Sequence, residues 1–476
     1  MPPRRRNTVR EKRDKMNREF VREQLYQKYI APTKKKRKNY VGIEIEMPIM
    51  NLNREAVDFN VIHQITDRFM KHFQFQEAGR DEEGNIYSIS DHVHGDILSY
   101  DCSYNNLELS LGKEKELFSI QRRFLDYYDF LQNELGKHHY TLTGMGVNPY
   151  RIYNHNVPIP NGRYRMLFHH LNSYKNYDLP MFFHEYPAFG TFSSASQVQL
   201  DVDFEELLPT IQAFSRLEPI KAVLFSNSVL LNEHEELLCC RDMFWENSTH
   251  GINPHNVGMF DCSLDSEEDL LSYIESTSIY CVEREEKYIN FPPVNIMEYF
   301  EKPWVEGEYY ENGVYKKNRV TPQIEDIQYL RTFKFEDLTF RGTIEFRSVC
   351  CQPIQDAMTV AAFHLGLKQQ LQELNELLEQ DHVLYHHGYT AGELRKMFVQ
   401  QEWPSFVDQD ELYALVKKVL ELAKKGLENR GYGEERLLDP LFDRMEKRTN
   451  PAKQMLELRN RGVDMQEIIR QYGQAK

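Results

Sequence analysis

The sequence lacks the segments that would anchor or export the chain. None of its 476 residues belongs to an apolar run approaching the roughly 18 residues that a membrane-spanning helix needs. The basic N-terminus, MPPRRR, is not followed by the apolar stretch of a secretory signal peptide. We therefore expect a cytoplasmic protein with no membrane partner.

Cysteine is scarce as well. The chain has seven, including the vicinal pairs Cys239–Cys240 and Cys350–Cys351, which lack the two-residue gap typical of zinc sites. Seven cysteines in a chain this long do not make the dense framework of a disulfide-stabilised domain, so we expect free thiols. His92 and His94, in SDHVHGD, could pair on a metal, but their spacing and loop context favour surface residues.

The usual sequence signatures of nucleotide and acyl chemistry are also missing. There is no Walker A motif, no glycine-rich dinucleotide fingerprint after a strand and no G-x-S-x-G motif. Internal repeats and low-complexity linkers are absent too. If the protein handles phosphate, metal ions and arginine side chains must bind it.

Charge is distributed unevenly. Residues 1–40 contain 15 Lys and Arg against 4 Asp and Glu, whereas the whole chain has 58 against 73 and a net charge of −15. A body this acidic is not built to bind polyanions over its whole surface. The patch KKKRK at 34–38 resembles a nucleic-acid or localisation signal. We favour the simpler alternative, in which the basic arm, residues 1–39, is a solvated and partly helical leader.

Three regions follow from the pattern along the chain. The basic arm, residues 1–39, precedes a body in which strands alternate with helices, residues 40–355. The remainder, residues 356–476, is almost entirely helical in pattern and should pack on the same body. The sequence therefore predicts an α+β fold.

Several helices can be placed from their end signals. Apolar residues at turn spacing predict a helix over 119–137. A second helix is expected over 204–227, with Pro219 as a break. Asn450 followed by Pro451 predicts a helix start in the C-terminal region.

Four strand-like segments each have one apolar face and one polar face. Side chains two residues apart on a strand point the same way, so the alternation separates the two faces. The apolar faces should pack on helices. The polar faces carry Glu44 and Glu46 in YVGIEIEMPIM, Asn106, Glu108 and Ser110 in NNLELS, Gln197, Gln199 and Asp201 in SQVQLDVD, and Glu345 and Arg347 in TIEFRS.

Two interpretations explain these polar faces. An antiparallel sheet with one face in water would need no further function. Exposed strand faces, however, usually include lysine and threonine, whereas these carry Glu, Gln and Arg without lysine. Carboxylates held close together raise each other's pKa, and a divalent cation removes the conflict. All-oxygen ligands favour Mg²⁺ or Mn²⁺, so the pattern suggests a metal–nucleotide site with Arg347 beside Glu345.

The order and spacing of short segments along the chain resemble the glutamate–cysteine ligase family, also called the gamma-glutamylcysteine synthetases. The segments are GIEIE (42–46), DCSYNNLELS (101–110), GMGVNP (144–149), RYRML (163–167), SASQVQLD (194–201), RDMFW (241–245), REEKY (284–288), TIEFRS (343–348) and the tail TNPAKQML. The resemblance covers roughly residues 40–470 and leaves the basic arm outside. It implies a glutamine-synthetase-like fold, in which a curved, largely antiparallel sheet forms a funnel, helices lie on its outer face and the C-terminal part is helical.

The resemblance also implies roles for individual residues. The implied Mg²⁺ ligands are Glu44, Glu46, Asp101, Glu108 and Glu345. The implied catalytic residues are Arg347, which contacts the transferred phosphoryl group, with Glu345 and Arg331. The implied substrate-binding residues are Arg241, which takes the amino-acid carboxylate, with Gln197, Gln199, Arg163, Arg284 and Tyr288. Many plant-type and proteobacterial relatives carry His-Leu-Thr-Thr before the late strand, whereas this chain has YLRTFKF at 329–335, so Arg331 is a substitute contact to phosphate.

The reaction implied by the resemblance is ATP-dependent amide formation. ATP would activate the glutamate side-chain carboxylate as a gamma-glutamyl phosphate, and the amine of cysteine would displace phosphate to give gamma-glutamylcysteine, the first step of glutathione synthesis. The implied cofactors are ATP and Mg²⁺ or Mn²⁺, and the implied partners are glutamate, cysteine and ATP. Two alternatives remain: a related ligase with a different amine acceptor, and a non-catalytic binding protein that uses residues 1–39.

Overall fold

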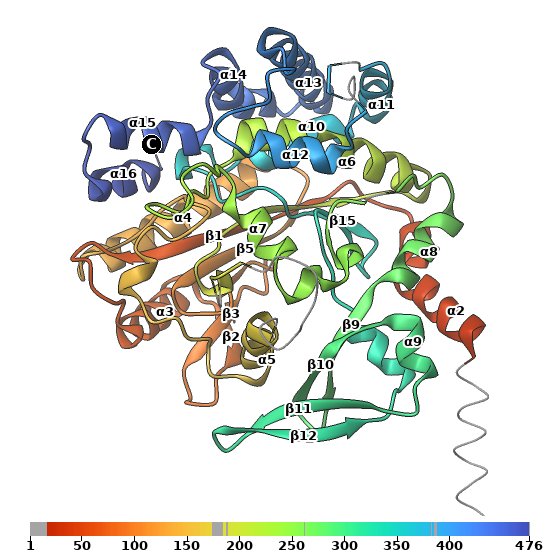
Figure 1. Ribbon diagram of the computed structural model, residues 1–476. Coiled ribbons are helices and arrows are strands. Elements are labelled where there is room, and N and C mark those ends of the chain that lie inside the picture. The colour runs from red at the N-terminus through yellow and green to blue at the C-terminus, as the bar shows by residue number, and fades with distance from the viewer. Residues whose placement is uncertain are drawn as a thin grey trace, which may run out of the picture.

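A nine-stranded antiparallel sheet lies at the centre of the fold (Figure 1). The computed structural model describes residues 17–173, 184–186, 189–260, 262–381, 383–384 and 388–475. Eight strands follow the order β14-β15-β7-β1-β5-β4-β3-β2, and β6 pairs with β1. Their bounds are β1 Val41–Asn51, β2 Gln76–Arg80, β3 Ile86–Ser90, β4 Ile97–Tyr100, β5 Asn106–Glu114, β6 Tyr140–Leu142, β7 Ser196–Asp201, β14 Glu336–Leu338 and β15 Thr343–Phe346.

Two smaller sheets accompany the main one. A four-stranded antiparallel sheet has the order β12-β11-β10-β9, and a short parallel pair joins β13 to β8. Their bounds are β8 Val257–Gly258, β9 Ser278–Arg284, β10 Lys287–Asn295, β11 Val305–Glu311, β12 Val314–Val320 and β13 Phe333–Lys334.

Helices cover the main sheet and form the C-terminal part. Those before residue 356 are α2 Arg18–Tyr29, α3 Phe59–Phe73, α4 Leu117–Gly136, α5 Gly162–Asn172, α6 Phe204–Phe225, α7 Cys240–Glu246, α8 Glu267–Ser276 and α9 Ile296–Glu301. The C-terminal ones are α10 Thr359–Lys368, α11 Leu371–Glu379, α12 Ala391–Phe398, α13 Gln409–Arg430, α14 Asp439–Glu446, α15 Pro451–Asn460 and α16 Met465–Tyr472. Within the described ranges, no helix combines the length and apolarity needed to cross a membrane.

The alternation in the four strand-like segments is confirmed, and all four are neighbours in one sheet. They are β15, β7, β1 and β5, which are consecutive in the strand order. Their apolar residues, such as Ile43, Leu107, Val198 and Ile344, are buried in the main hydrophobic core together with residues of α3, α4, α6 and α10. The α+β expectation of an antiparallel sheet with helices on one face and a helical C-terminal part is therefore confirmed.

The predicted break at Pro219 is wrong. Helix α6 runs without interruption from Phe204 to Phe225, with both Pro209 and Pro219 inside it. A proline within a helix costs about 3 kcal/mol because it removes one backbone hydrogen bond and crowds the preceding turn. Nearly every residue of α6 after Ile211 is buried, and burying each large apolar side chain contributes about 2 kcal/mol, which offsets the cost of the proline. The other helix predictions agree with the structure, including Asn450 as the N-cap of α15 and Pro451 at its first turn.

The interpretation of the basic arm as a solvated leader is wrong for residues 18–33, whereas most of residues 34–39 is exposed. Residues 18–29 form α2, and its Val21 and Leu25, one turn apart, are buried in the main core. Arg22 pairs with Glu275 of α8 at 2.8 Å. The segment is therefore packed on the body, while residues 1–16 lie outside the described residues.

Candidate active site

The polar faces of β15, β7, β1 and β5 form the floor of a cavity of about 530 Å³, which we call the funnel. The strand register brings the acidic residues together across the sheet. Glu46 lies directly opposite Glu108, Glu44 lies opposite Gln197, and Glu345 lies opposite Gln199. Because directly opposed side chains have Cβ atoms about 5 Å apart, these carboxylates share one surface.

Two glutamines of β7 connect the carboxylates. The Gln199 amide donates to Glu44 at 2.9 Å and to Glu345 at 3.0 Å. The Gln197 amide donates to Glu46 at 2.7 Å, and the Ala195 backbone amide donates to the other oxygen of that carboxylate at 2.7 Å. The predicted polar faces thus meet through hydrogen bonds rather than facing bulk water.

The funnel carboxylates, Glu44, Glu46 and Glu108, resist ionisation. Burial and the charge of Glu345 raise the pKa of Glu44 well above its ordinary value. Burial, Asp101 and Glu108 raise the pKa of Glu46 to about 8, and burial with Asp101 raises the pKa of Glu108 to about 7. A site with this many acids and raised pKa values is short of positive charge.

The donor set fits a divalent cation that keeps part of its water shell. No three carboxylate oxygens of the funnel lie within 4.8 Å of one another in the described part of the chain, so a ready-made all-protein cage is absent. Mg²⁺ does not need one, because it commonly binds through one or two carboxylates and retains waters. The buried Gln197 Oε1 has no hydrogen-bond partner within the described residues, which fits an atom that accepts from the water shell of a bound cation. Metal binding here stays a prediction.

A compact acidic cluster elsewhere does not compete with the funnel. Asp91, His94 and Asp96 come within 4.8 Å of one another. Asp96, however, already accepts hydrogen bonds from Arg123 at 2.8 Å and Tyr127 at 2.8 Å. His94 is exposed, as the sequence predicted. This cluster is therefore saturated by the protein itself.

Arg347 reaches from β15 into the funnel, as predicted. Its guanidinium lies 3.4 Å from Glu345 and 3.6 Å from Asp337 of β14. These two carboxylates raise the pKa of Arg347 despite its burial, so it stays charged. Burial raises the pKa of Asp337 to about 6 in spite of Arg347. Sequence analysis missed Asp337 because β14 is only three residues long and shows no alternation.

Arg241 enters the funnel from α7 and is held by neutral groups. Its guanidinium donates to the Ser193 hydroxyl at 3.1 Å and to the Ser348 carbonyl at 3.3 Å. It is 6% exposed, and its charge stabilises ionised Glu46. A buried cation held by neutral oxygens suits the binding of a small carboxylate.

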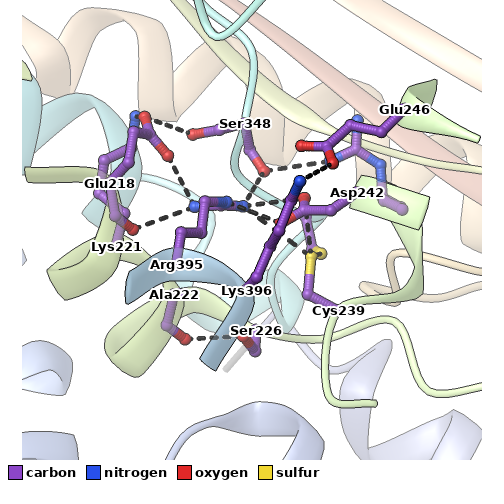
Figure 2. A network of polar contacts seen from close by, with 12 residues as sticks. Glu218, Lys221, Ala222, Ser226, Cys239, Asp242, Glu246, Ser348, Arg395 and Lys396 are labelled. Carbon is purple, nitrogen blue, oxygen red and sulfur yellow. Dashed lines mark hydrogen bonds and ion pairs between the residues drawn. The ribbon is translucent and has the colours of Figure 1, made fainter. Parts of the chain in front are cut away.

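The next residue of α7, Asp242, anchors that helix from behind. Figure 2 shows Arg395 of α12 between Glu218 and Asp242. The Arg395 guanidinium donates to Asp242 at 2.7 and 3.0 Å and to Glu218 at 2.6 Å. Lys221 also pairs with Glu218. We call Glu218, Lys221, Asp242, Glu336 and Arg395 the Arg395 network. It fixes α7, the helix that carries Arg241.

The remaining predicted residues divide into two sets. Asp101, Arg163 and Arg331 line the funnel. Arg284 does not line it: it pairs with Asp326 in the second sheet through two bonds of 2.6 Å. Tyr288 does not line it either, and its ring packs in a small cluster with Met166, Tyr280, Cys281 and Tyr329. The implied role of Arg284 and Tyr288 as wall residues therefore finds no support, although Tyr280 of the same sheet does line the funnel.

Several lining residues were missed from the sequence. Trp245 and Phe333 stack at 4.3 Å beside Arg347, and Arg341 donates to Gln199 at 2.7 Å. Lys28 and Tyr29 reach the funnel from α2. The aromatic pair could not be recognised because its members come from segments almost 90 residues apart, which only the fold brings together.

Plant enzymes are among the known proteins that are similar to this chain in sequence. Chloroplastic glutamate–cysteine ligase from Solanum lycopersicum is 24% identical over 313 residues, which are 63% of this chain and 54% of the relative. The enzyme of that name from Arabidopsis thaliana is 23% identical over 325 residues, 67% of this chain and 57% of the relative. The chain spans about half the length of the curated relatives it matches.

A solved structure shares the fold. Glutamate–cysteine ligase from Francisella tularensis, crystallised in complex with AMP, superposes with a TM-score of 0.52 and 11% identity over 92% of this chain and 89% of that one. The family pattern described as Glutamate-cysteine ligase family 2 (GCS2) matches residues 40–474, which include every strand of the funnel floor. The chain belongs to glutamate–cysteine ligase family 2.

Proposed function

We propose that this protein is a glutamate–cysteine ligase. It would use ATP to activate the side-chain carboxylate of glutamate as a gamma-glutamyl phosphate and would join it to the amine of cysteine. The product, gamma-glutamylcysteine, is the first intermediate of glutathione synthesis. The observation that carries the proposal is the funnel, in which carboxylates of β15, β1 and β5, joined by glutamines of β7, face arginines.

The two ends of the funnel suit different parts of the reaction. Arg241, held among neutral oxygens, would take the α-carboxylate of glutamate. Arg347, already charged and held by Glu345 and Asp337, would offset the charge on the phosphoryl group during transfer. Catalysis would consist mainly of positioning and charge neutralisation, as in other phosphoryl transfers.

The funnel carboxylates and Glu345 would hold Mg²⁺, or Mn²⁺ in its place. A bound divalent cation would neutralise phosphate oxygens during the transfer. The protein's own part is to present the carboxylates at fixed positions, which Gln197 and Gln199 do through their hydrogen bonds. The nucleotide would be Mg–ATP.

A second candidate is a ligase of the same chemistry with another amine acceptor. The segment YLRTFKF at 329–335 departs from the pattern of many relatives, and its Arg331 lines the funnel. A changed lining residue alters which amine fits while leaving the carboxylates in place. A cytoplasmic location belongs to the proposal too, supported by the six buried cysteines, which are free thiols.

Phosphate release from Mg–ATP tests the proposal. We expect release that requires both glutamate and cysteine, with gamma-glutamylcysteine detected by mass spectrometry. Release with glutamate and another amine, but not with cysteine, would favour the second candidate. Folded protein that releases no phosphate with glutamate and any amine of a panel would refute both.

A further inference from the structure

The N-terminal segment reaches the funnel although it precedes the family match. The match begins at residue 40, yet Lys28 and Tyr29, at the end of α2, line the cavity. They lie on the side of β14 and β15, near Arg331 and Asp337, whose charges act on them. This chain therefore brings its own residues to a site that the family region otherwise builds.

The first contact of this segment is with the loop that carries Arg331. The Lys28 ammonium donates to the carbonyl of Ile327 at 2.7 Å, and the Tyr29 hydroxyl donates to the carbonyl of Leu330 at 3.0 Å. Leu330 directly precedes Arg331, in the segment that departs from the pattern of relatives. The end of α2 thus fixes the path of this loop along the cavity.

The second contact is with the turn between β14 and β15. Arg37 donates to the carbonyl of Arg341 at 3.0 Å. Gly342 has a φ of +75°, and a Cβ added there would come within 2.7 Å of the Pro32 backbone. The turn can therefore approach Pro32 this closely only with glycine at that position. It carries Arg341, which reaches Gln199 on the funnel floor at 2.7 Å.

Cations gather at this end of the funnel. Lys28, Arg331, Arg341 and Arg347 all line it. Of these, Arg347 pairs with Asp337 and Glu345, whereas Lys28, Arg331 and Arg341 form no ion pair with another described residue. Burial and the neighbouring Arg331 lower the pKa of Lys28 to about 8. Two cations that repel each other beside a cavity are stabilised by a polyanion bound between them.

We propose that Lys28 binds the phosphate chain of the nucleotide and that Lys28 and Tyr29 form part of the wall at the nucleotide end of the funnel. The ligand class is a nucleoside triphosphate, so this inference rests on the proposed function and adds a binding residue to it. Lys28 has three donors, and the Ile327 carbonyl takes one of them, which leaves donors for phosphate oxygens. Tyr29 and Arg37 are positioning residues, because they act through the loops that carry Arg331 and Arg341.

A purely structural role for Lys28 would explain its bond to Ile327 equally well. A lysine in the last turn of a helix also interacts favourably with the helix dipole. The two roles differ in their effect on the nucleotide. A structural lysine sets stability alone, whereas a binding lysine sets nucleotide affinity and leaves the affinity for glutamate unchanged.

The experiment compares Lys28→Met and Lys28→Gln, which remove the charge, with Lys28→Arg, which keeps it. Arg18→Met is the matched control, because Arg18 lies on the same helix and pairs with exposed Glu301 at 3.3 Å. Calorimetry with Mg²⁺ and the non-hydrolysable analogue AMP-PNP gives the dissociation constant, and steady-state kinetics give KM for ATP and for glutamate. Melting temperatures monitor folding.

We expect the dissociation constant of the analogue and the KM for ATP to rise about 10-fold in Lys28→Met and Lys28→Gln, as for loss of one charged hydrogen bond. For Lys28→Arg, both constants should stay within about 3-fold of the wild-type values. For the control Arg18→Met, both should equal the wild-type values. Unchanged nucleotide affinity in both neutral variants, or an equal rise in the KM for glutamate, would overturn the inference. Wild-type protein that binds the analogue but ligates no amine would refute the proposed function alone, because the binding measurement still tests Lys28.

Discussion

Two groups of buried carboxylates lie back to back in this protein, and they differ in how their charge is compensated. In the Arg395 network, burial alone would raise the pKa of Glu218, but Lys221 and Arg395 lower it to about 2. In the funnel, burial and neighbouring acids raise the pKa of Glu46 to about 8 and that of Glu108 to about 7. The network supplies cations for Glu218 and Asp242, although burial and Glu218 raise the pKa of its third acid, Glu336, well above the ordinary value. In the funnel, Glu44, Glu46 and Glu108 all keep raised pKa values.

This difference distinguishes carboxylates that hold the fold together from carboxylates that we propose to bind a cation. A buried ion pair that is complete adds little net stability but costs much when one partner is removed. A buried group of acids without enough cations destabilises the fold until cations arrive from solution. We therefore interpret the funnel acids as groups that lower folding stability in exchange for binding a cation. The Arg395 network, by contrast, is a scaffold that holds Arg241 of α7 in place.

The largest effect on stability should come from breaking the Arg395 network. We expect Arg395→Met to lower the free energy of unfolding by about 3–5 kcal/mol, because Glu218 and Asp242 lose their shared partner while buried. Urea denaturation monitored by circular dichroism measures this. Lys396→Met is the matched control, since Lys396 is mostly exposed and pairs with Glu246 at the surface, and it should change stability by less than about 0.5 kcal/mol. Equal stability of the two variants would show that the network is not a scaffold.

Substitutions of the funnel carboxylates should have the opposite effect and lower activity rather than stability. Glu44→Gln and Glu345→Gln should each reduce turnover by at least about 100-fold, or roughly 3 kcal/mol, because a metal or phosphate contact is lost. Their stability without metal should be unchanged or higher, because each replaces an acid of a mutually repelling set with an amide that cannot ionise. Phosphate-release assays and urea denaturation measure the two effects. Glu306→Gln, on an exposed position of β11, is the control and should match wild type in both. Loss of stability together with activity would indicate a structural role for these carboxylates.

Glu46 of the funnel and Glu218 of the Arg395 network should also give opposite pH dependence. Glu46 has a folded-state pKa raised from 4.5 to about 8, so metal-free protein should lose stability as pH rises from about 4.5 to 8, by up to about 1.4 kcal/mol per pH unit. Glu218 has a pKa lowered to about 2, so its contribution is present above pH 4.5 and is lost as pH falls toward 2.

Urea denaturation across pH 5–8, with and without Mg²⁺, resolves the funnel's share of this dependence. Mg²⁺ should remove most of the loss toward high pH, because a bound cation favours the ionised carboxylates. Glu46→Gln should flatten the metal-free profile in the same range. A profile that Mg²⁺ and Glu46→Gln both leave unchanged would mean that the acids of the funnel do not control stability there.

The sequence predicted which carboxylates share the funnel, because strand periodicity encodes that feature. Glu44, Glu46, Glu108 and Glu345 were assigned to one surface because alternation fixes the face of a strand. Periodicity and end signals also predicted helices and their caps correctly. The exception was the break predicted at Pro219, which lies inside a largely buried, continuous helix. It could not assign a strand to a sheet.

The residues that were missed or misplaced depend on tertiary packing. Arg284 is on a strand, but that strand belongs to the second sheet, where its partner is Asp326. Lys28 comes from a segment whose basic composition is typical of a solvated leader, and its burial depends on partners about 300 residues away. The Arg395 network joins α6, α7 and α12, and no local pattern marks its members as partners. Charge balance between distant residues is therefore the property that requires the fold.

The smallest effect should come from Tyr288, which the family resemblance assigns to substrate binding. The structure places its ring in the cluster around Met166 and Tyr329, behind the funnel wall formed by α5. We expect Tyr288→Phe to leave kcat and both KM values within about 2-fold of wild type and stability within about 0.5 kcal/mol, because the ring and its packing remain. Steady-state kinetics with ATP and glutamate varied in turn would detect a larger change. A rise of more than about 10-fold in either KM would place this hydroxyl in contact with substrate, and the funnel would then extend along the second sheet beyond Tyr280, which already lines it.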